Sequence, residues 1–181
     1  SGFRRGDSTA LHLVHLIQNI MQSRHLKEHT GMCFFDLAKA FDTVWHRGLI
    51  AKLGAYGIGG NLLCFFESYL TDRLQAVRVG NTLSSPQAIN SGVPQGSILG
   101  PLFFLVYVND LPMSVPNVSL FADDTTVSAS NSCRQLLVND LQKKINSTIS
   151  WMSTWKLRPN TSKTKVMFFC SGASDQFCNV S

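Results

Sequence analysis

The sequence lacks the features that mark a membrane or secreted protein. No stretch reaches the ~20 apolar residues of a membrane-spanning helix, because the most apolar run, residues 98–108, contains Gly100 and Pro101. The 181 residues hold no signal peptide, internal repeat or low-complexity segment. We therefore expect an intracellular protein that does not associate with membranes.

Cysteine is scarce and irregularly spaced. The five cysteines are odd in number, and none belongs to a C-x-x-C or Cys/His pattern of a zinc site. They are interpreted as reduced thiols of an intracellular protein rather than as disulfides. Cys33 and Cys64 lie among phenylalanines and are expected in the core.

Acidic residues are few: 11 Asp and Glu stand against 16 Lys and Arg, a net charge of +5. This charge agrees with a polyanionic partner such as nucleic acid. The bases concentrate in residues 134–165, where Asp140 is the single acid. That segment either faces a nucleic-acid backbone or forms the solvated side of a helix. Hydrophobic content of 44% with 15% charged residues is typical of a globular domain with a real core.

Two adjacent carboxylates, Asp123 and Asp124, lie between two apolar segments. Residues 115–122 and 125–127 both read as strands, so a tight turn would hold the two like charges together. Their repulsion costs stability unless a cation offsets it, and oxygen ligands of this kind suit Mg²⁺ or Mn²⁺. Taken alone, Asp-Asp also occurs in ordinary turns.

A third acid, Asp36, lies near the end of another apolar segment. Residues 31–37 open with a glycine and have the pattern of a buried strand, and residues 38–42 then turn into a helix or a wide bend. A carboxylate beside Phe34 and Phe35 would be poorly solvated, so it needs a charge partner. That partner is either a Lys or Arg side chain or a metal ion.

Four segments, taken in order, resemble motifs of the reverse transcriptases of non-LTR (LINE-type) retrotransposons. They are FFDLAKAFDTVWH from Phe34, SGVPQGSILGPLFFLVYVNDLP from Ser91, FADD from Phe121 and NTSKTK from Asn160. The resemblance runs from Gly2 to about Phe169, and four ordered motifs are far more specific than any one of them. Since the chain starts at Ser1 within a further family motif, the G-F-R segment of Gly2-Phe3-Arg4, and without an initiator methionine, we expect a fragment of a longer protein.

The resemblance implies a metal site made by the three acids. In that family the matching positions, Asp36 and Asp123, hold two Mg²⁺ ions, and Asp124 completes the acidic cluster. The chemistry agrees, because nucleotidyl transfer uses one metal to activate the primer 3′-hydroxyl and another to neutralise the leaving pyrophosphate. Carboxylates from two separate strand ends can bridge such a pair of ions.

The resemblance also implies substrate-binding residues. Phe41 matches the steric gate under the sugar of the incoming nucleotide, where a ring disfavours a 2′-hydroxyl; without the motif it would be read as a core aromatic. Gln95 matches the glutamine that packs against the incoming nucleotide and the template. Gly96 beside it lets the backbone approach closely.

Three basic residues complete the implied site. Lys163 matches a lysine that neutralises or protonates the pyrophosphate, with a solvated surface lysine as the alternative. Arg4 and Arg5 match a basic pair that contacts template or triphosphate, although basic residues at a chain end are usually just solvated. Asp42 and Asp110 are expected to make local hydrogen bonds or caps.

The predicted fold class is α+β: a right-hand polymerase palm, with a small antiparallel sheet backed by helices, and part of the fingers. Residues 1–30 would form a fingers-proximal helix, 31–170 the palm with inserted fingers-like helices and a hairpin, and 171–181 a tail towards a missing thumb. Helices are expected over residues 8–26, 44–53, 61–70 and 132–155. Further strands are expected over 165–170 and in a hairpin over 74–89 that turns at Gly80-Asn81.

The helical segments show apolar stripes. The 132–155 helix has the clearest helical period, which predicts a helix that packs against the sheet. Its two tryptophans, Trp151 and Trp155, are interpreted as packing residues, with base stacking as the alternative. For the 8–26 helix, Ser8 is the predicted cap, and its apolar face is Leu13, Leu16, Ile17 and Ile20, widened by Leu11, Val14 and Met21.

The leading hypothesis is an RNA-directed DNA polymerase that acts on an RNA template, a DNA primer and dNTPs with Mg²⁺ or Mn²⁺. The isolated chain would be a poor polymerase without a thumb and full fingers. One alternative is a catalytically incompetent nucleic-acid-binding fragment of a retroelement. Another is a metal-dependent phosphohydrolase, which would leave the P-Q-G loop around Gln95 unexplained.

Overall fold

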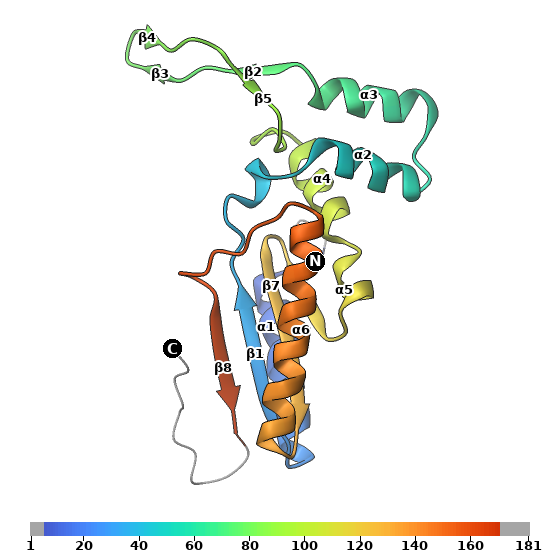
Figure 1. Cartoon of the computed structure of the whole chain (residues 1–181), viewed down its shortest axis with the longest axis vertical. Coiled ribbons are helices and arrows are strands. Elements are labelled where there is room, and N and C mark those ends of the chain that lie inside the picture. The colour runs from blue at the N-terminus through green and yellow to red at the C-terminus, as the bar shows by residue number, and fades with distance from the viewer. Residues whose placement is uncertain (1–5, 171–181) are drawn as a thin grey trace. The chain divides into compact units, whose positions relative to one another are not determined.

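The computed structural model describes residues 6–170. The chain divides into two compact units, one formed by residues 1–38 with 110–181 and the other by residues 39–109 (Figure 1). We call them the sheet unit and the inserted unit and describe each by itself. No helix among residues 6–170 is both long and apolar enough to cross a membrane.

The sheet unit is built on four antiparallel strands. They are β1 (His29–Phe35), β6 (Val118–Phe121), β7 (Asp124–Asn131) and β8 (Lys165–Phe169), in the spatial order β6-β7-β1-β8. Strand β1 is central and nearly continuous in burial, as its run of apolar residues predicts. It pairs with β7 from His29 opposite Asn131 to Phe35 opposite Thr125.

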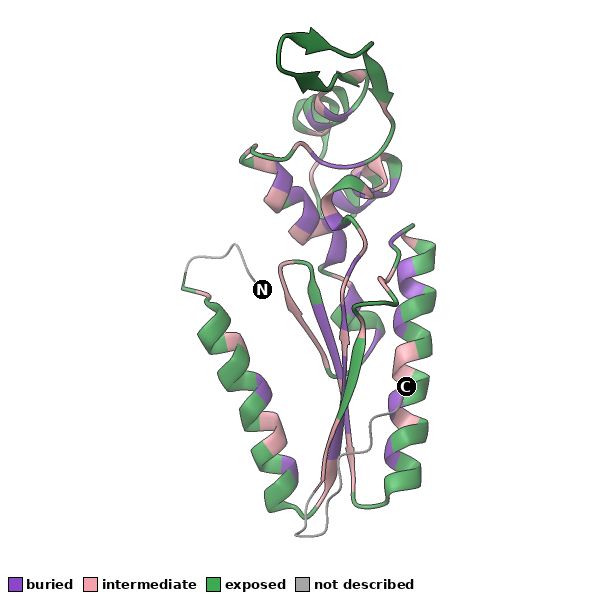
Figure 2. Cartoon of the chain, turned by 90° about the vertical axis from the view of Figure 1, so that its left-hand side faces the viewer, coloured by how far each residue is buried: buried purple, intermediate pink, exposed green. Residues whose placement is uncertain are grey.

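Two long helices cover opposite faces of this sheet (Figure 2). Helix α6 (Arg134–Thr154) buries Leu137, Leu141 and Met152, and Leu141 Cδ2 would lie 2.9 Å from a Cβ placed on Gly31. Glycine at this position therefore lets α6 lie close to β1 without a shift of the Leu141 side chain. The predicted stripe of the 132–155 segment is confirmed as core, since α6 packs on β1 and β7.

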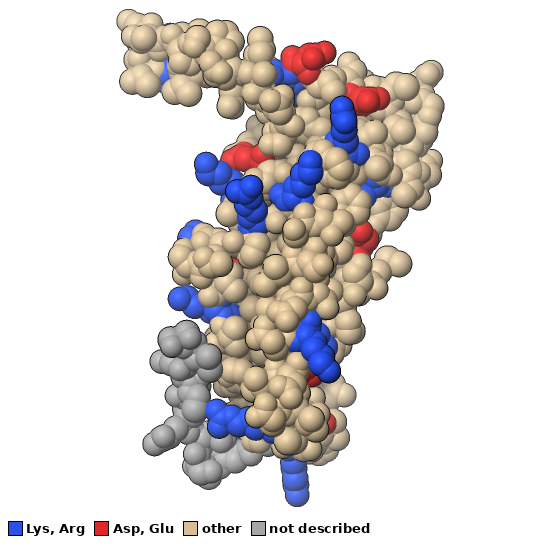
Figure 3. All heavy atoms as spheres, viewed as in Figure 1, with Lys and Arg blue, Asp and Glu red and all other residues tan. Residues whose placement is uncertain are grey.

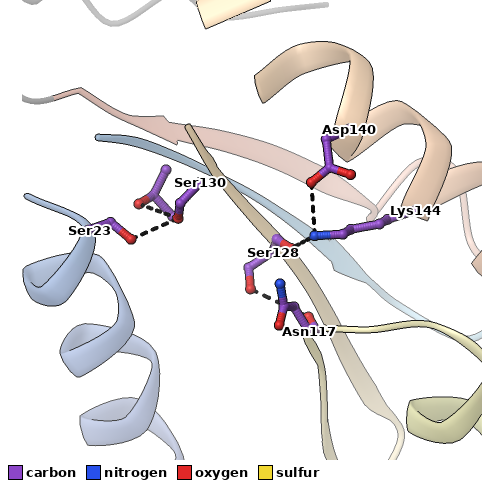
Figure 4. Close-up of polar contacts among 7 residues, drawn as sticks. Ser23, Asn117, Ser128, Ser130, Asp140 and Lys144 are labelled. Atoms are coloured by element: carbon purple, nitrogen blue, oxygen red, sulfur yellow. Dashed lines mark hydrogen bonds and ion pairs between the residues drawn. The ribbon is translucent and has the colours of Figure 1, made fainter. Parts of the chain in front are cut away.

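Helix α1 (Thr9–His25) lies on the other face and makes polar contacts there. Ser8 caps it by accepting a hydrogen bond from the Leu11 amide at 3.1 Å, as predicted. The Ser23 hydroxyl donates to Ser130 Oγ at 2.8 Å, and Thr30 Oγ1 lies 3.1 Å from the same oxygen (Figure 4). Ser128, also on β7, accepts at its carbonyl oxygen from Lys144 of α6, which pairs with Asp140 at 2.9 Å.

The apolar face expected for α1 is mostly outside the core. Leu16 is buried, whereas Leu13, Ile17 and Met21 are exposed. The reason is the polar contact just described: the face of the sheet below α1 carries serine and threonine, so the helix meets it with Ser23 and only part of its apolar stripe.

The inserted unit combines helices with an extended hairpin. Its helices are η1 (Ala40–Asp42), α2 (His46–Ala55), α3 (Gly60–Leu70) and α4 (Leu99–Val108). Fully buried aromatic side chains of α4, Phe103, Phe104 and Tyr107, form its core, and Phe66 of α3 meets Phe103 edge-on at 5.1 Å. The short helix α5 (Leu111–Ser114) follows α4 along the chain and belongs to the sheet unit.

The predicted hairpin is present but interrupted. Strands β2 (Arg73–Gln75) and β5 (Gln87–Ile89) pair at its base, and β3 (Arg78–Val79) and β4 (Thr82–Leu83) pair at its tip. The turn falls at Gly80-Asn81 as expected, with Gly80 at φ +58°.

The predicted mixture of helices with a small antiparallel sheet is confirmed, with helices on both faces of the sheet. The expectation for Cys64 is wrong. It is exposed, because Phe66 and Leu70 form the buried face of α3, while Cys33 is buried as expected. Both are free thiols, as are Cys133 and Cys170. The division into fingers-proximal, palm and tail segments stays a prediction.

Candidate active site

The two adjacent acids lie at the β6–β7 hairpin. Phe121 pairs with Asp124, so the loop consists of two residues, Ala122 and Asp123. Ala122 has φ +52°, in the left-handed region that costs an L-residue about 1–2 kcal/mol. A tight hairpin of this length requires such a conformation, and it places both carboxylates at the end of the sheet.

Asp36 reaches the same end of the sheet along β1. The last pair of the β1–β7 ladder is Phe35 with Thr125, and Asp36 and Asp124 are the next residues on the two strands. Since side chains alternate between faces along a strand, Asp36 and Asp124 lie on the face that Thr30 and Ser130 also share. The structure therefore brings all three predicted acids to one end of the sheet.

The carboxylates influence one another electrostatically. Desolvation raises the pKa of Asp124 above its ordinary value, and the neighbouring charges of Asp123 and then Asp36 raise it further. Among the described residues no Lys or Arg pairs with these acids. The Lys or Arg partner considered for Asp36 from sequence is thus not found among residues 6–170, and the nearby group whose charge lowers the pKa of Asp124 is His12.

The cluster is not a finished metal site. In the part of the chain that the structure describes, no group of three or more His, Cys, Asp or Glu side chains is placed to hold a metal ion. Charges act over several ångströms, whereas coordination requires oxygens about 2.0–2.6 Å from one ion. The three acids are therefore neighbours, but their carboxylate oxygens are not arranged to coordinate a single ion. Carboxylates are nevertheless ligands that suit a divalent cation.

Lys163 lies in a turn that is attached to the Asp36 segment. The Asn160 amide donates to the Asp36 carbonyl oxygen at 2.7 Å, and the Ala38 amide donates to the Arg158 carbonyl oxygen at 2.9 Å. The turn closes with the Lys163 amide donating to the Asn160 carbonyl oxygen at 3.1 Å. Lys163 is exposed, so the structure brings the backbone of the fourth motif beside Asp36 and leaves the ammonium in solvent.

His12 is a neighbour of the acids that sequence reasoning missed. Its ring lies 5.4 Å from that of Phe121, and its Nδ1 lies 3.4 Å from Ser119 Oγ. Burial lowers the pKa of His12, and the charge of Asp124 opposes that shift. No motif contains this histidine, and no local pattern connects α1 with the hairpin, because the contact arises from the packing of α1 on the sheet.

The inserted unit holds Phe41, Gln95 and Gly96. Phe41, in η1, is half-buried and packs against Phe104 with ring centroids 4.9 Å apart, so it is partly a core aromatic. Gln95 donates from Nε2 to Asp42 Oδ1 at 2.8 Å. Gly96 has φ +80° and open space where a Cβ would stand. Arg4 and Arg5 lie outside the described residues.

Gln95 and Asp42 line a cleft of about 620 Å³ within the inserted unit. Lys39 and Arg73 also line it, which gives the cleft basic groups suited to phosphate. Figure 3 shows Lys and Arg at several places on the viewed face of the chain, with fewer Asp and Glu beside them.

Residues 1–177 match the family described as reverse transcriptase (RNA-dependent DNA polymerase). The chain belongs to this family, which confirms the resemblance seen in its motifs.

Curated relatives include polymerases of Drosophila melanogaster mobile elements. The chain is 37% identical to the probable RNA-directed DNA polymerase from transposon BS, with 90% of the chain and 19% of the relative covered. It is 33% identical to the corresponding protein from transposon X-element, with 93% and 19% covered. It is 30% identical to the RNA-directed DNA polymerase from mobile element jockey, with 94% and 19% covered. The chain spans about a fifth of the length of these relatives.

Solved structures with a similar fold include telomerase of Candida tropicalis. The apo form truncated from the C-terminal domain matches 94% of this chain and 38% of its own, with a TM-score of 0.66 and 17% identity. The telomerase in complex with a fragment of telomeric RNA matches 93% of this chain and 30% of its own, with a TM-score of 0.68 and 16% identity. These likenesses support the predicted polymerase palm and fingers as a fold.

Proposed function

We propose that this chain is the catalytic palm, with part of the fingers, of an RNA-directed DNA polymerase. The observation that carries the proposal is the position of Asp36, Asp123 and Asp124 at the same end of the sheet, in a chain of the reverse transcriptase family. The substrates are an RNA template, a DNA primer and dNTPs, as the names of its relatives and the RNA-bound telomerase fold suggest.

The reaction joins the primer 3′-oxygen to the α-phosphorus of a dNTP, breaks the bond to pyrophosphate and releases the hydroxyl proton. Two bound Mg²⁺ or Mn²⁺ ions would activate the hydroxyl and neutralise the leaving group. Asp36, Asp123 and Asp124 would hold them, because burial and then the charges of Asp123 and Asp36 raise the pKa of Asp124, and a bound cation would favour its ionised form.

The other residues bind and orient the substrates. The ring of Phe41 would lie under the sugar and disfavour a 2′-hydroxyl, and Gln95 with Gly96 would pack against the nucleotide and the template. Lys163 would neutralise or protonate the pyrophosphate, for which its exposed ammonium is available. Arg4 and Arg5 would contact the template or the triphosphate.

The test is primer extension on an RNA template by the polypeptide that carries this chain. Asp123→Asn and Asp36→Asn should each lower incorporation by at least about a hundredfold, since metal stabilisation of the transition state is worth several kcal/mol. Asp140→Asn is the matched control, because Asp140 lies on α6 and pairs with Lys144. Equal extension by the Asp123→Asn variant would overturn the assignment of the site.

The second candidate is a chain that binds nucleic acid without catalysis, because no group of three or more His, Cys, Asp or Glu among the described residues is placed to hold a metal ion. It would give retention of RNA on a filter without incorporation at any Mg²⁺ or Mn²⁺ concentration. Incorporation that requires Asp36 and Asp123 would exclude it.

A further inference from the structure

We propose that Asp42 is a positioning residue that holds the Gln95 amide in the orientation used for nucleotide binding. The inference rests on the proposed function for its role in catalysis. The pair itself rests on geometry within the inserted unit, where Gln95 Nε2 donates to Asp42 Oδ1 at 2.8 Å across 53 residues of sequence.

Backbone contacts hold Asp42 in place. Its amide donates to the Lys39 carbonyl oxygen at 2.9 Å, and its carbonyl oxygen accepts from Ser91 Oγ at 3.0 Å. Gly92 lies so close that a Cβ there would stand 2.8 Å from the Asp42 carbonyl oxygen. The backbone of Asp42 is therefore held by contacts that do not involve the Gln95 side chain, and its carboxylate offers Gln95 an acceptor at a defined position.

Further hydrogen bonds join the η1 region to the Gln95 loop on both sides of this contact. The Val93 amide donates to the Phe41 carbonyl oxygen and the Gly92 amide to the Val44 carbonyl oxygen, both at 2.8 Å. His46 Nε2 lies 2.7 Å from the Gly92 carbonyl oxygen. Among these contacts, the Asp42–Gln95 hydrogen bond joins two side chains. Both residues line the cleft.

The chemistry of the pair fixes which end of the amide points where. An ionised carboxylate only accepts hydrogen bonds, so Gln95 must present its NH₂ group to Asp42. The carbonyl Oε1 then lies on the opposite side of the amide. Asp42 therefore orients the Gln95 amide so that its Oε1 can accept a hydrogen bond from the bound nucleotide. Without Asp42 the amide could rotate and present either end, so binding would weaken.

Single-nucleotide incorporation by the polypeptide that carries this chain tests the role. Asp42→Ala and Gln95→Ala should each raise the KM for dNTP about tenfold, the effect of losing one charge-assisted hydrogen bond, with kcat changed less than about twofold. The double variant should be no worse than either single variant, because both remove one interaction. Asp42→Asn should stay within about threefold of the parent, since its amide oxygen accepts the same bond.

Glu67→Ala is the matched control, an exposed carboxylate of α3 in the same unit, and should leave KM unchanged. The proposal is overturned if Asp42→Ala leaves KM unchanged while Gln95→Ala raises it, or if the two effects multiply in the double variant. It is also overturned if Asp42→Asn is as harmful as Asp42→Ala, because the charge of Asp42 would then matter and not its hydrogen bond.

A second readout does not need activity. Relaxation of the Gln95 side-chain ¹⁵N in the 181-residue chain should show an ordered amide in the parent and in Asp42→Asn, and a mobile one in Asp42→Ala. If the parent incorporates no nucleotide although its Gln95 amide is ordered, the proposed function is refuted and the Asp42–Gln95 interaction stands. If the parent incorporates nucleotides fully although its Gln95 amide is mobile, only the Asp42–Gln95 interaction is refuted.

Discussion

Gly92 is a position in the inserted unit where a single methyl group should disturb both the local backbone conformation and a backbone contact. Its φ is +92°, and a Cβ would stand 2.8, 2.9 and 3.0 Å from the backbone O, Cα and C of Asp42. Backbone atoms cannot turn aside as a flexible side chain can. Gly92→Ala must therefore either strain the loop or separate it from η1.

The expected loss of unfolding free energy follows from these two terms. An alanine held at positive φ costs about 1–2 kcal/mol, and forcing a methyl group into a packed contact costs about 1–3 kcal/mol. Together they give about 2–5 kcal/mol for Gly92→Ala. Gly57→Ala is the matched control in the same unit, with φ +86° and nothing within 4 Å of its Cβ, so it should cost only about 1–2 kcal/mol.

Urea unfolding of the two variants and the parent, followed by circular dichroism and by tryptophan fluorescence, measures the difference. The slopes of the unfolding curves should agree, so that the midpoints report stability. If Gly92→Ala is no less stable than Gly57→Ala, the loop does not lie against η1 as described. In that case the contact between Gly92 and the Asp42 backbone, which helps to hold Asp42 in place, is also absent.

Three further outcomes are expected. Ala122→Gly should stabilise the chain by about 0.5–1 kcal/mol in urea unfolding, because glycine removes the positive-φ cost at the hairpin; a loss of stability would show that the loop is relaxed. Asp124 has a raised pKa in the folded chain, so its carboxyl lowers stability as pH rises from its ordinary pKa through the folded value. Asp124→Asn should therefore melt at a higher temperature than the parent at pH 7 in EDTA and lose that advantage at about pH 3; an advantage independent of pH would contradict this. Burial raises the pKa of the Cys33 thiol to about 11, so a thiol reagent should modify the exposed Cys64 and Cys133 in the native chain and reach Cys33 only after unfolding.

The sequence was sufficient to predict that the acids lie at the ends of apolar strands. The resemblance to reverse transcriptases implied that these strands belong to one sheet, and the structure places the three acids at the same end of it. The pairing register was not predictable, yet it is what places Asp36 and Asp124 next to each other beyond the last ladder pair. Strand patterns specify which face is buried, whereas register depends on tertiary contacts.

Side-chain environments were predicted less well than elements. Cys64 lies between apolar neighbours in sequence, but the helical period turns it away from the face that Phe66 and Leu70 bury. The partner of Gln95 lies 53 residues away in a 3₁₀ turn, and no local pattern connects the two. Likewise, no motif marks His12, because its contact with Phe121 arises from how α1 crosses the sheet.

The metal site can be tested most directly by anomalous scattering from crystals of the chain soaked in Mn²⁺. We expect two Mn²⁺ peaks roughly 3.5–4 Å apart, bounded by the carboxylates of Asp36, Asp123 and Asp124 and absent in Asp36→Asn. Mn²⁺ bound only elsewhere, or three carboxylates that stay apart at saturating Mn²⁺, would contradict the two-metal polymerase site.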